Sequence, residues 1–292
     1  VSFSLSGDGV CVVSGDLSEN FSSGSFWWGF DIYKLPVKHL VIAEGVTEIG
    51  EYSFYEWGQI EELTLPSSLI RIGREAFWRC GKIKQIHFSE GLQTIGSYAF
   101  GSCPIDILDL PKTLTKIEES VFSGFKQLVE LNMPDSLVSI GDRAFRDCSS
   151  LRSVKLPAHL KVIPESLFSG CEALEQVQMP DDLEVIERYA FSDCLKLKSI
   201  TLPNSVRIVA DSAFESEEFD DGRLHYCITN YITNKNDCTV SAKEWNGRLD
   251  IPSSISHGGR AFIVNGLDFS GCKGLTAVRI PDTISTIPEC AF

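Results

Sequence analysis

The chain has 292 residues, of which 43% are hydrophobic and 23% charged, so it holds enough apolar material for a folded core. Its formal net charge of −14 argues against binding to nucleic-acid backbones or anionic membranes, because both need clustered Lys and Arg. The sequence has no apolar run of the roughly 18 residues that a membrane span requires, so we expect no transmembrane segment.

Residues 1–36 do not follow the pattern that fills most of the remaining chain. Their first part alternates apolar and polar residues on either side of Gly7-Asp8-Gly9, which predicts a β-hairpin. An aromatic stretch containing Trp27 and Trp28 follows. We interpret this segment as an N-terminal cap that closes the open end of a repeat array. The alternative is an aromatic platform on which sugar rings stack.

Residues 37–214 are organised by regularly spaced phenylalanines. Six of the seven gaps between them are 23 residues long and one is 22, and the positions are Phe54, Phe77, Phe100, Phe122, Phe145, Phe168, Phe191 and Phe214. The consensus around them is C-x-x-L-x-x-I-x-L-P-x-x-L-x-x-I-x-x-x-A-F. A fixed period of this length indicates a β-rich solenoid of stacked repeats.

Each repeat is too short to enclose a core alone, so neighbouring repeats must cover its apolar positions. The stretch x-I-x-L-P alternates like a half-buried strand and ends at proline, which cannot donate to a β-ladder. The second half of the repeat should form a turn, followed by a short extended piece or a tight helical turn. We expect the phenylalanines to stack in one continuous column that dominates the core.

Six cysteines share one slot, three residues after the repeat phenylalanine: Cys80, Cys103, Cys148, Cys171, Cys194 and Cys272. The same slot holds Trp57 and Phe125 in other repeats, which indicates an apolar core position. Stacked strands lie about 4.8 Å apart, wider than the ~3.8 Å between the Cβ atoms of a disulfide. We therefore predict a ladder of buried, reduced thiols without a metal ion. For Cys227 and Cys238, outside the ladder, two free thiols are favoured over a bridge across one hairpin.

Phe214 and Phe269 are 55 positions apart, which is one period of 23 plus 32 residues. We expect residues 215–268 to form a β-rich insertion with strands near 224–229, 239–243 and 261–264. Within it, Leu249-Asp-Ile251-Pro252 recovers half of a repeat, and the repeat resumes over residues 269–292. The acidic run 217–222 is interpreted as a solvated turn. A calcium loop is the alternative, although the alternating acidic order of such a loop is missing.

The blocks L-x-x-I-x-L-P and A-F-x-x-C recur in one register and resemble the BspA-like (Treponema-type) class of leucine-rich repeats. The resemblance covers Lys38 to Phe214 and Phe269 to Phe292. It implies a right-handed leucine-rich-repeat solenoid on the bacterial cell surface or outside the cell, which adheres to proteins of a host or a neighbouring cell. No leader is visible at Val1, so this location is an expectation from the resemblance alone.

The sequence contains no phosphate loop, zinc-protease motif or nucleophile elbow. Its histidines are scattered and are interpreted as surface residues: His39, His87, His159, His225 and His257. The ladder cysteines should be buried, whereas a nucleophile needs access and a paired base. We therefore predict a protein that is not an enzyme and has no catalytic residues, cofactor or metal.

Strand alternation assigns one outward-facing position between I and L of each x-I-x-L-P block. These positions are Thr64, His87, Asp109, Asn132, Lys155, Gln178 and Thr201. They vary widely in type while the core slots do not, as expected where a solenoid recognises a partner. We predict that this strand ladder is the partner-binding surface.

An aromatic site near the N-terminal end is the rival and consists of Trp27, Trp28, Trp57 and Trp78. Trp78 follows Phe77 in a slot where other repeats place Gly, Ser or Arg, so we expect its ring to be exposed. Non-enzymatic protein binding by the repeat surface is the function favoured by the sequence. Carbohydrate binding by the aromatic residues and a purely structural spacer are the alternatives.

Overall fold

The structure, a computed structural model, describes residues 1–18, 36–210, 212–214, 217–220, 224–228, 237–242, 244–257, 260–270, 272–288 and 291–292. The chain divides into two compact units. The first unit consists of Val1–Lys198 and Leu202–Ala213, and the second unit consists of Ser199–Thr201 and Phe214–Phe292. All elements in the described part of the chain are β-strands, and no helix there is long and apolar enough to cross a membrane.

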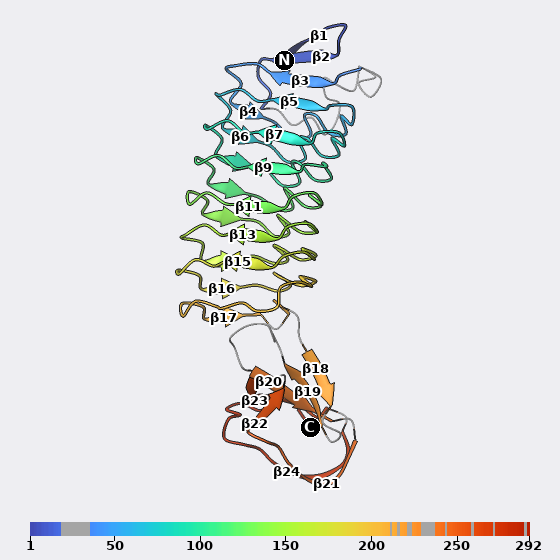
Figure 1. Ribbon diagram of the computed structural model, residues 1–292, viewed down its shortest axis with the longest axis vertical. Coiled ribbons are helices and arrows are strands. Elements are labelled where there is room, and N and C mark those ends of the chain that lie inside the picture. The colour runs from blue at the N-terminus through green and yellow to red at the C-terminus, as the bar shows by residue number, and fades with distance from the viewer. Residues whose placement is uncertain are drawn as a thin grey trace. The chain divides into compact units, whose positions relative to one another are not determined.

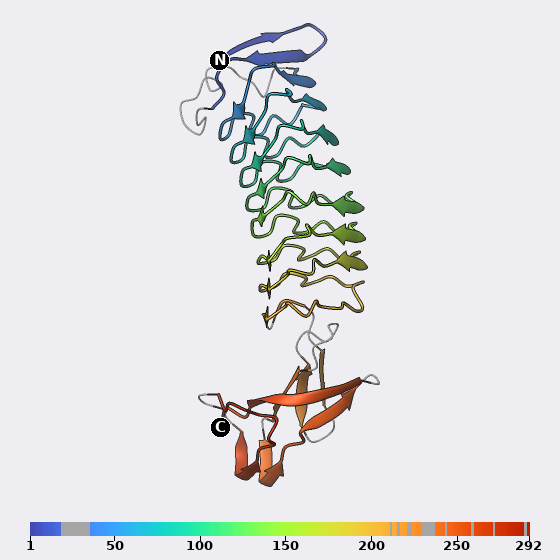
Figure 2. The ribbon, with the colours of Figure 1, turned by 90° about the vertical axis from the view of Figure 1, so that its left-hand side faces the viewer.

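The first unit is a stack of coils, most of which give one strand to each of two parallel sheets, while the last gives only β17 (Ile208–Val209) (Figures 1 and 2). The first sheet contains β3 (His39–Ile42), β5 (Glu62–Thr64), β7 (Gln85–His87), β9 (Ile107–Asp109), β11 (Glu130–Asn132), β13 (Ser153–Lys155) and β15 (Gln176–Gln178). The second contains β4 (Glu48–Ile49), β6 (Arg71–Ile72), β8 (Thr94–Ile95), β10 (Lys116–Ile117), β12 (Ser139–Ile140), β14 (Val162–Ile163), β16 (Val185–Ile186) and β17 (Ile208–Val209). The β-solenoid predicted from the repeat is confirmed.

The two sheets are interrupted at different coils. Hydrogen-bonded pairing along the first sheet stops between β9 and β11, where the second sheet continues from β4 to β12. The second sheet stops between β12 and β14, where the first continues from β11 to β15. Strand β9 lies in the single repeat with a 22-residue phenylalanine gap. Because the interruptions are staggered, at least one sheet joins each coil to the next.

The predicted N-terminal hairpin is present. Strands β1 (Ser2–Leu5) and β2 (Val10–Ser14) pair antiparallel, and β2 then pairs parallel with β3 of the first coil. On β2, Cys11 and Val13 are fully buried while Val12 is exposed. The alternating pattern therefore presents one apolar flank to the first coil, which is how the hairpin caps the stack (Figure 2).

The repeat phenylalanines form the column that the sequence predicts. Consecutive rings from Phe54 to Phe191 are buried and stack with centroid separations of 5.2–6.2 Å and interplanar angles of 6–27°. The widest separation joins Phe100 and Phe122, and Phe88 packs edge-on against both rings. Phe88 replaces the leucine of the L-P block in its repeat, so a third ring enters the column at this point.

The turn around each phenylalanine is held by the next coil. Around Phe54, Tyr52 and Glu56 adopt left-handed backbone angles, with φ of 58° and 60°. Such angles cost an L-residue about 1–2 kcal/mol. The Phe54 N–H donates to the Ala76 carbonyl at 2.8 Å, and the Glu56 N–H donates to the Trp78 carbonyl at 2.8 Å. The second half of the repeat is thus a two-residue strand and a left-handed turn, rather than a helical turn.

The ladder cysteines of the first unit are buried, and their thiols donate to a carbonyl. Each Sγ lies 3.3–3.5 Å from the phenylalanine oxygen of the preceding repeat, in Cys80, Cys103, Cys148, Cys171 and Cys194. Burial raises the pKa of the Cys103 thiol to about 12. Trp57 and Phe125 are also buried, which confirms that the slot belongs to the core.

The cysteines of the second unit differ from that ladder. Cys272 is only half-buried, and its Sγ lies 4.0 Å from the Lys273 carbonyl oxygen rather than against a phenylalanine carbonyl. Neither Cys227 nor Cys238 forms a disulfide, and the strand pairing places Cys227 opposite Thr239. The favoured prediction of two unbridged thiols agrees with this register.

The second unit has a core and sheets of its own. One mixed sheet contains β18 (Glu217–Asp220), β19 (His225–Ile228), β20 (Asp237–Ser241), β22 (Ser254–His257) and β23 (Arg260–Asp268). A parallel pair contains β21 (Glu244–Asp250) and β24 (Lys273–Arg279). The antiparallel pair β19–β20 leads to a parallel partner, β23, just as β1–β2 leads to β3. Each unit therefore contains an antiparallel pair joined to a parallel strand.

Two expectations for residues 215–292 have different outcomes. For the half repeat, the register is parallel: Leu249 and Asp250 pair with Val278 and Arg279, in the segment where we expect the repeat to resume. The acidic run is not a turn, because Glu217–Asp220 forms strand β18 and pairs antiparallel with β19. The register places Phe219 of the run opposite Tyr226, and aromatic residues are of a type that favours strands over turns.

Replacement of Phe145 by alanine should lower the free energy of unfolding of the first unit by about 3–5 kcal/mol. Its buried ring stacks between Phe122 and Phe168, so alanine leaves a cavity inside the column. Urea denaturation followed by circular dichroism measures the change. The control is Val138→Ala, at a residue that is 67% exposed, and we expect it to stay within about 0.5 kcal/mol of wild type. Equal losses would contradict the column.

The thiols should separate by reactivity toward Ellman's reagent at pH 8. A pKa of about 12 makes the Cys103 thiolate roughly a thousandfold scarcer than that of an ordinary thiol with a pKa near 8.5. Half-buried Cys227 and Cys272 should react first, and the ladder cysteines only after unfolding in urea. Mass spectrometry of the labelled peptides identifies the sites. Early labelling of Cys103 or Cys171 in the native protein would show that the ladder is open.

Candidate functional site

The predicted strand ladder follows the first sheet of the first unit. Strand register places Thr64 opposite His87 and His87 opposite Asp109. After the interruption, the registers Asn132↔Lys155 and Lys155↔Gln178 continue the same column. All six side chains are exposed, and Thr201, which falls in the second unit, is exposed as well.

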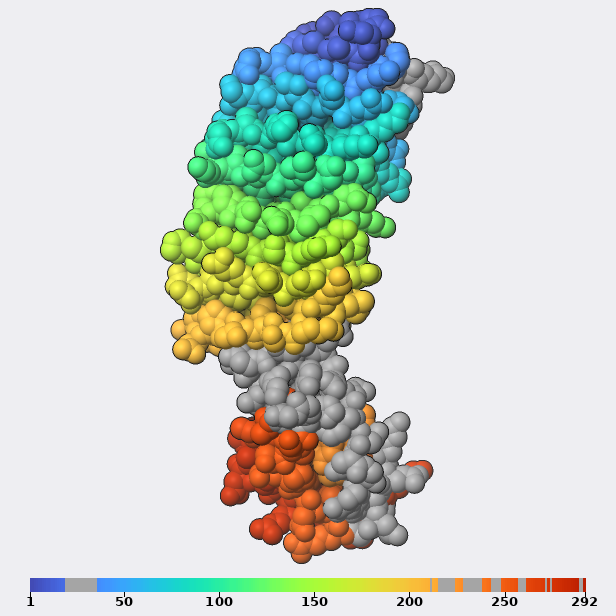
Figure 3. All heavy atoms as spheres, in the orientation of Figure 1, coloured from blue at the N-terminus to red at the C-terminus, as the bar shows by residue number. Residues whose placement is uncertain are grey.

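Two further columns of outward residues run beside this one in the first unit. The column two positions earlier contains His39, Glu62, Gln85, Ile107, Glu130, Ser153 and Gln176. The column just before the strands contains Lys38, Glu61, Lys84, Asp106, Val129, Arg152 and Glu175. Most of these side chains are polar or charged. The three columns together are called the ladder face here, and Figure 3 shows the successive coils of the first unit as coloured bands.

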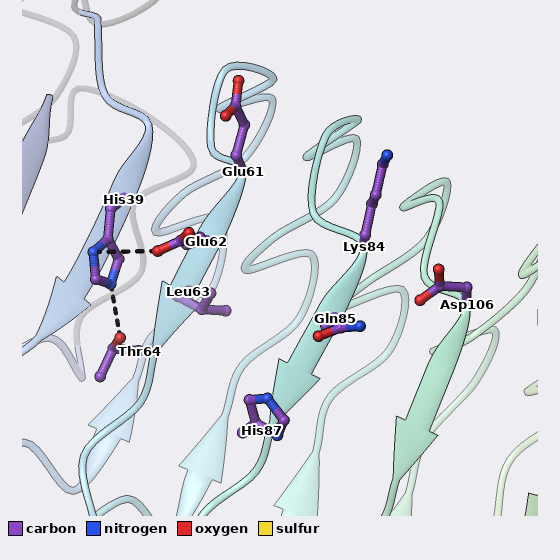
Figure 4. A pocket seen from close by; sticks show the side chains of 9 residues that line it. All are labelled: His39, Glu61, Glu62, Leu63, Thr64, Lys84, Gln85, His87 and Asp106. Carbon is purple, nitrogen blue, oxygen red and sulfur yellow. Dashed lines mark hydrogen bonds and ion pairs between the residues drawn. The ribbon is translucent and has the colours of Figure 1, made fainter.

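A groove lies at the end of the ladder face nearest the hairpin (Figure 4). It has a volume of about 430 Å³ and is lined by His39, Glu61, Glu62, Leu63, Thr64, Lys84, Gln85, His87 and Asp106. These residues come from β3, β5, β7 and the position before β9, so four successive coils build it. Two members of the predicted ladder, Thr64 and His87, belong to this ladder groove.

His39 is the best-connected side chain of the ladder groove. Its Nε2 lies 2.8 Å from Thr64 Oγ1, and its Nδ1 lies 3.6 Å from Glu62 Oε2 (Figure 4). The His39 side chain is 30% exposed, whereas that of Glu62 is 75% exposed. Lys82 Nζ approaches Glu61 Oε1 at 3.8 Å. The imidazole of one coil and the carboxylate and hydroxyl groups of the next thus face one space.

The order hydroxyl, imidazole and carboxylate in Thr64, His39 and Glu62 is also that of a nucleophilic triad. The geometry suits binding better than acyl transfer. The 3.6 Å between His39 and Glu62 is too long for an orienting hydrogen bond, and the carboxylate is largely in water. Backbone N–H groups on this face point along the sheet to neighbouring strands, so they do not form an oxyanion hole.

The described residues offer no group of three or more His, Cys, Asp or Glu side chains that could hold a metal ion. Two histidines do line the ladder groove, but from strands two coils apart. The polar groups of the groove can act as hydrogen-bond donors and acceptors for a ligand.

The structure leaves fewer exposed rings in the alternative aromatic site than the sequence predicts. Trp57 fills the cysteine slot, is only 7% exposed and packs edge-on against Phe54, so it is not a surface residue. Trp78 is half-buried and stacks on Tyr55 at 5.0 Å, and the Arg79 guanidinium lies over its ring at 4.0 Å. Trp27 and Trp28 lie outside the described residues. Among the four predicted aromatics, Trp78 alone is described at the surface, and its ring already has protein partners.

The sequence did not predict that the side chains of the ladder groove lie close together. From the sequence we interpret His39 as an isolated surface histidine, whereas the structure joins it to Thr64, one coil along. The available signal was the spacing: His39 and Glu62 are one repeat apart, and Thr64 follows Glu62 by two positions. Parallel stacking therefore places all three on one face.

Comparisons with known proteins agree with this architecture. Residues 32–105, 93–220 and 252–292 match the family model described as BspA type leucine rich repeat region, with six copies. The crystal structure of a Treponema pallidum leucine-rich repeat protein is 29% identical with a TM-score of 0.53, and the match covers 67% of this chain and 87% of that one. A leucine-rich repeat protein from Bacteroides ovatus is 23% identical with a TM-score of 0.59, covering 86% of this chain and 62% of that one.

No curated protein matches the chain in sequence. The family model nevertheless spans well over half of the residues, and the stacked phenylalanines, the cysteine slot and the paired parallel sheets follow its repeat. The chain therefore belongs to the family of BspA-type leucine-rich repeat proteins.

Proposed function

We propose that this chain is a non-enzymatic binding protein, located on the bacterial cell surface or outside the cell, whose ladder face adheres to a protein of a host or a neighbouring cell. The observation that carries the proposal is the ladder face itself. It presents three aligned columns of varied, mostly polar side chains on a backbone whose own hydrogen bonds are used within the sheets. The family supports a protein-interaction surface of this kind.

The dimensions of the ladder face are compatible with a protein partner. Seven coils at a spacing of about 4.8 Å extend for roughly 30 Å. A standard protein interface covers about 800 Å² on each partner, which such a face can approach when the adjoining turns take part. The face therefore matches a folded protein surface better than a small molecule.

The composition of the ladder face favours many moderate contacts. Within its described columns, Ile107 is a large apolar side chain that is 58% exposed, and aromatic anchors of the kind that dominate tight interfaces are missing. Charged groups of both signs are present, with Arg152 and Lys155 on one coil and Asp106 and Asp109 on another. Complementary charges mainly determine partner choice and association rate, so binding should weaken with salt.

Carbohydrate binding by the aromatic residues remains the weaker alternative. A sugar stacks on a free aromatic face, whereas Trp78 is engaged by Tyr55 and Arg79. A structural spacer would require no partner for the ladder face at all. The assay below separates these functions.

The paired substitution Lys155→Glu and Gln178→Glu should reduce capture of a protein partner at least about tenfold, because it replaces one positive and one neutral side chain of the predicted strand ladder by two negative ones on neighbouring coils. Surface plasmon resonance against a panel of host extracellular-matrix and bacterial surface proteins, beside a glycan array, measures the loss. The matched control is Lys116→Glu on β10 of the second sheet, which should bind like wild type.

Two results would contradict the proposed function. Glycan binding that is abolished by Trp78→Ala and unaffected by the ladder substitutions would assign the function to the aromatic site. Absence of any protein or glycan ligand would leave only the spacer. Melting temperatures within a few degrees of wild type show that each variant is folded.

A further inference from the structure

We propose that the ladder groove accepts a cationic side chain, arginine or lysine, from the protein partner, and that protonation of its histidines releases this side chain. The inference rests on the proposed function and adds the chemistry of the partner at one end of the ladder face. It is carried by the shape of the ladder groove, the charges that line it and the contacts of His39.

The ladder groove is acidic when its imidazoles are neutral. Three carboxylates line it, Glu61, Glu62 and Asp106, against the single ammonium group of Lys84, for a net charge of −2 from three minus one. Lys82, outside the lining, partly offsets Glu61 at 3.8 Å. The carboxylates come from two different coils on either side of the space (Figure 4). A guanidinium or ammonium group that enters between them can donate charge-assisted hydrogen bonds to the carboxylates on both sides.

Glu62 is the acceptor that His39 controls. A neutral imidazole has one N–H, whereas an imidazolium donates from both nitrogens. In the protonated state, His39 can donate from Nε2 to Thr64 Oγ1, 2.8 Å away, and attract Glu62 through Nδ1, 3.6 Å away. The carboxylate is then engaged by the protein itself. His39 thus becomes an internal cation that competes with the cation of the partner.

His87 acts in the same direction. It lies opposite Thr64 on one side and Asp109 on the other. Glu62 lies on β5, between the strands β3 and β7 that carry the two histidines. Glu62 and His87 are 25 residues apart, the same offset that separates His39 from its hydrogen-bond partner Thr64. Protonation of both imidazoles raises the charge of the lining from −2 to 0.

The charged groups around the two histidines are identified from the packed strands. His39 is preceded by Lys38 and faces Glu61 and Glu62 of the next coil, while its other register neighbour is the apolar Val10. His87 follows Lys84 and has Asp106 and Asp109 on the next coil. Histidine is in general the side chain whose charge changes between pH 5 and 8.

The test uses the full chain and a defined probe, the peptide acetyl-Gly-Arg-Gly-amide, with a citrulline version as its neutral isostere. Amide and histidine-ring NMR shifts are followed during titration at pH 7.5 and pH 5.5. At pH 7.5 the arginine peptide should shift signals of the ladder groove, and the citrulline peptide should not. Binding of the arginine peptide should weaken about fivefold to tenfold at pH 5.5, as expected for loss of one charge-assisted contact.

Three variants separate the charged groups. Glu62→Gln should weaken binding about tenfold at pH 7.5. Glu172→Gln, at an exposed glutamate outside both the ladder face and the groove, is its matched control and should bind like wild type. His39→Gln retains an amide near the position of Nε2 but does not titrate, so it should reduce the difference between the two pH values.

The inference is overturned if the citrulline peptide binds as well as the arginine peptide, if affinity is equal at both pH values, or if Glu62→Gln and Glu172→Gln behave alike. These outcomes are distinct from failure of the proposed function, because the peptide titration needs no partner. A partner that is lost with the Lys155 and Gln178 substitutions while the arginine peptide fails to bind would sustain adhesion and reject this inference.

Discussion

Stacking of the repeat phenylalanines is the interaction on which the rest of the first unit depends. Ring centroids 5.2–6.2 Å apart are close to the ~4.8 Å spacing of hydrogen-bonded strands. One coil can therefore satisfy its ring contact and its backbone pairing at the same time. Where the two demands diverge, as at Phe100 and Phe122, a third ring enters and the first sheet stops pairing beyond β9.

That constraint explains why many backbone N–H groups and the ladder thiols form hydrogen bonds with a neighbouring coil. Left-handed turns around the rings donate to the following coil, and ladder thiols donate to the preceding one. These hydrogen bonds of the interior are therefore directed along the axis of the stack. The outward side chains of the ladder face are not needed for this cohesion, which allows them to differ from coil to coil.

The sequence predicted whatever depends on periodicity, and missed what depends on local pairing. The slot shared by Cys103, Trp57 and Phe125 predicts a core position from the sequence, and the burial of all three side chains confirms it. Periodicity also assigned Thr64 and His87 to one outward column. It gave no indication that Glu217–Asp220 would form a strand or that Tyr55 and Arg79 would cover Trp78, because those outcomes depend on partners outside the consensus.

The ladder groove shows how a uniform scaffold acquires a local property. The diagonal that connects His39 to Thr64 recurs along the stack, for example from Glu130 to Lys155 and from Ser153 to Gln178. The backbone geometry of these diagonals is similar, since the coils share one register. The side chains on a diagonal alone determine whether it carries a group whose charge depends on pH, an ion pair or only neutral groups. Substitution in the outward columns can therefore change recognition without altering the phenylalanine column beneath.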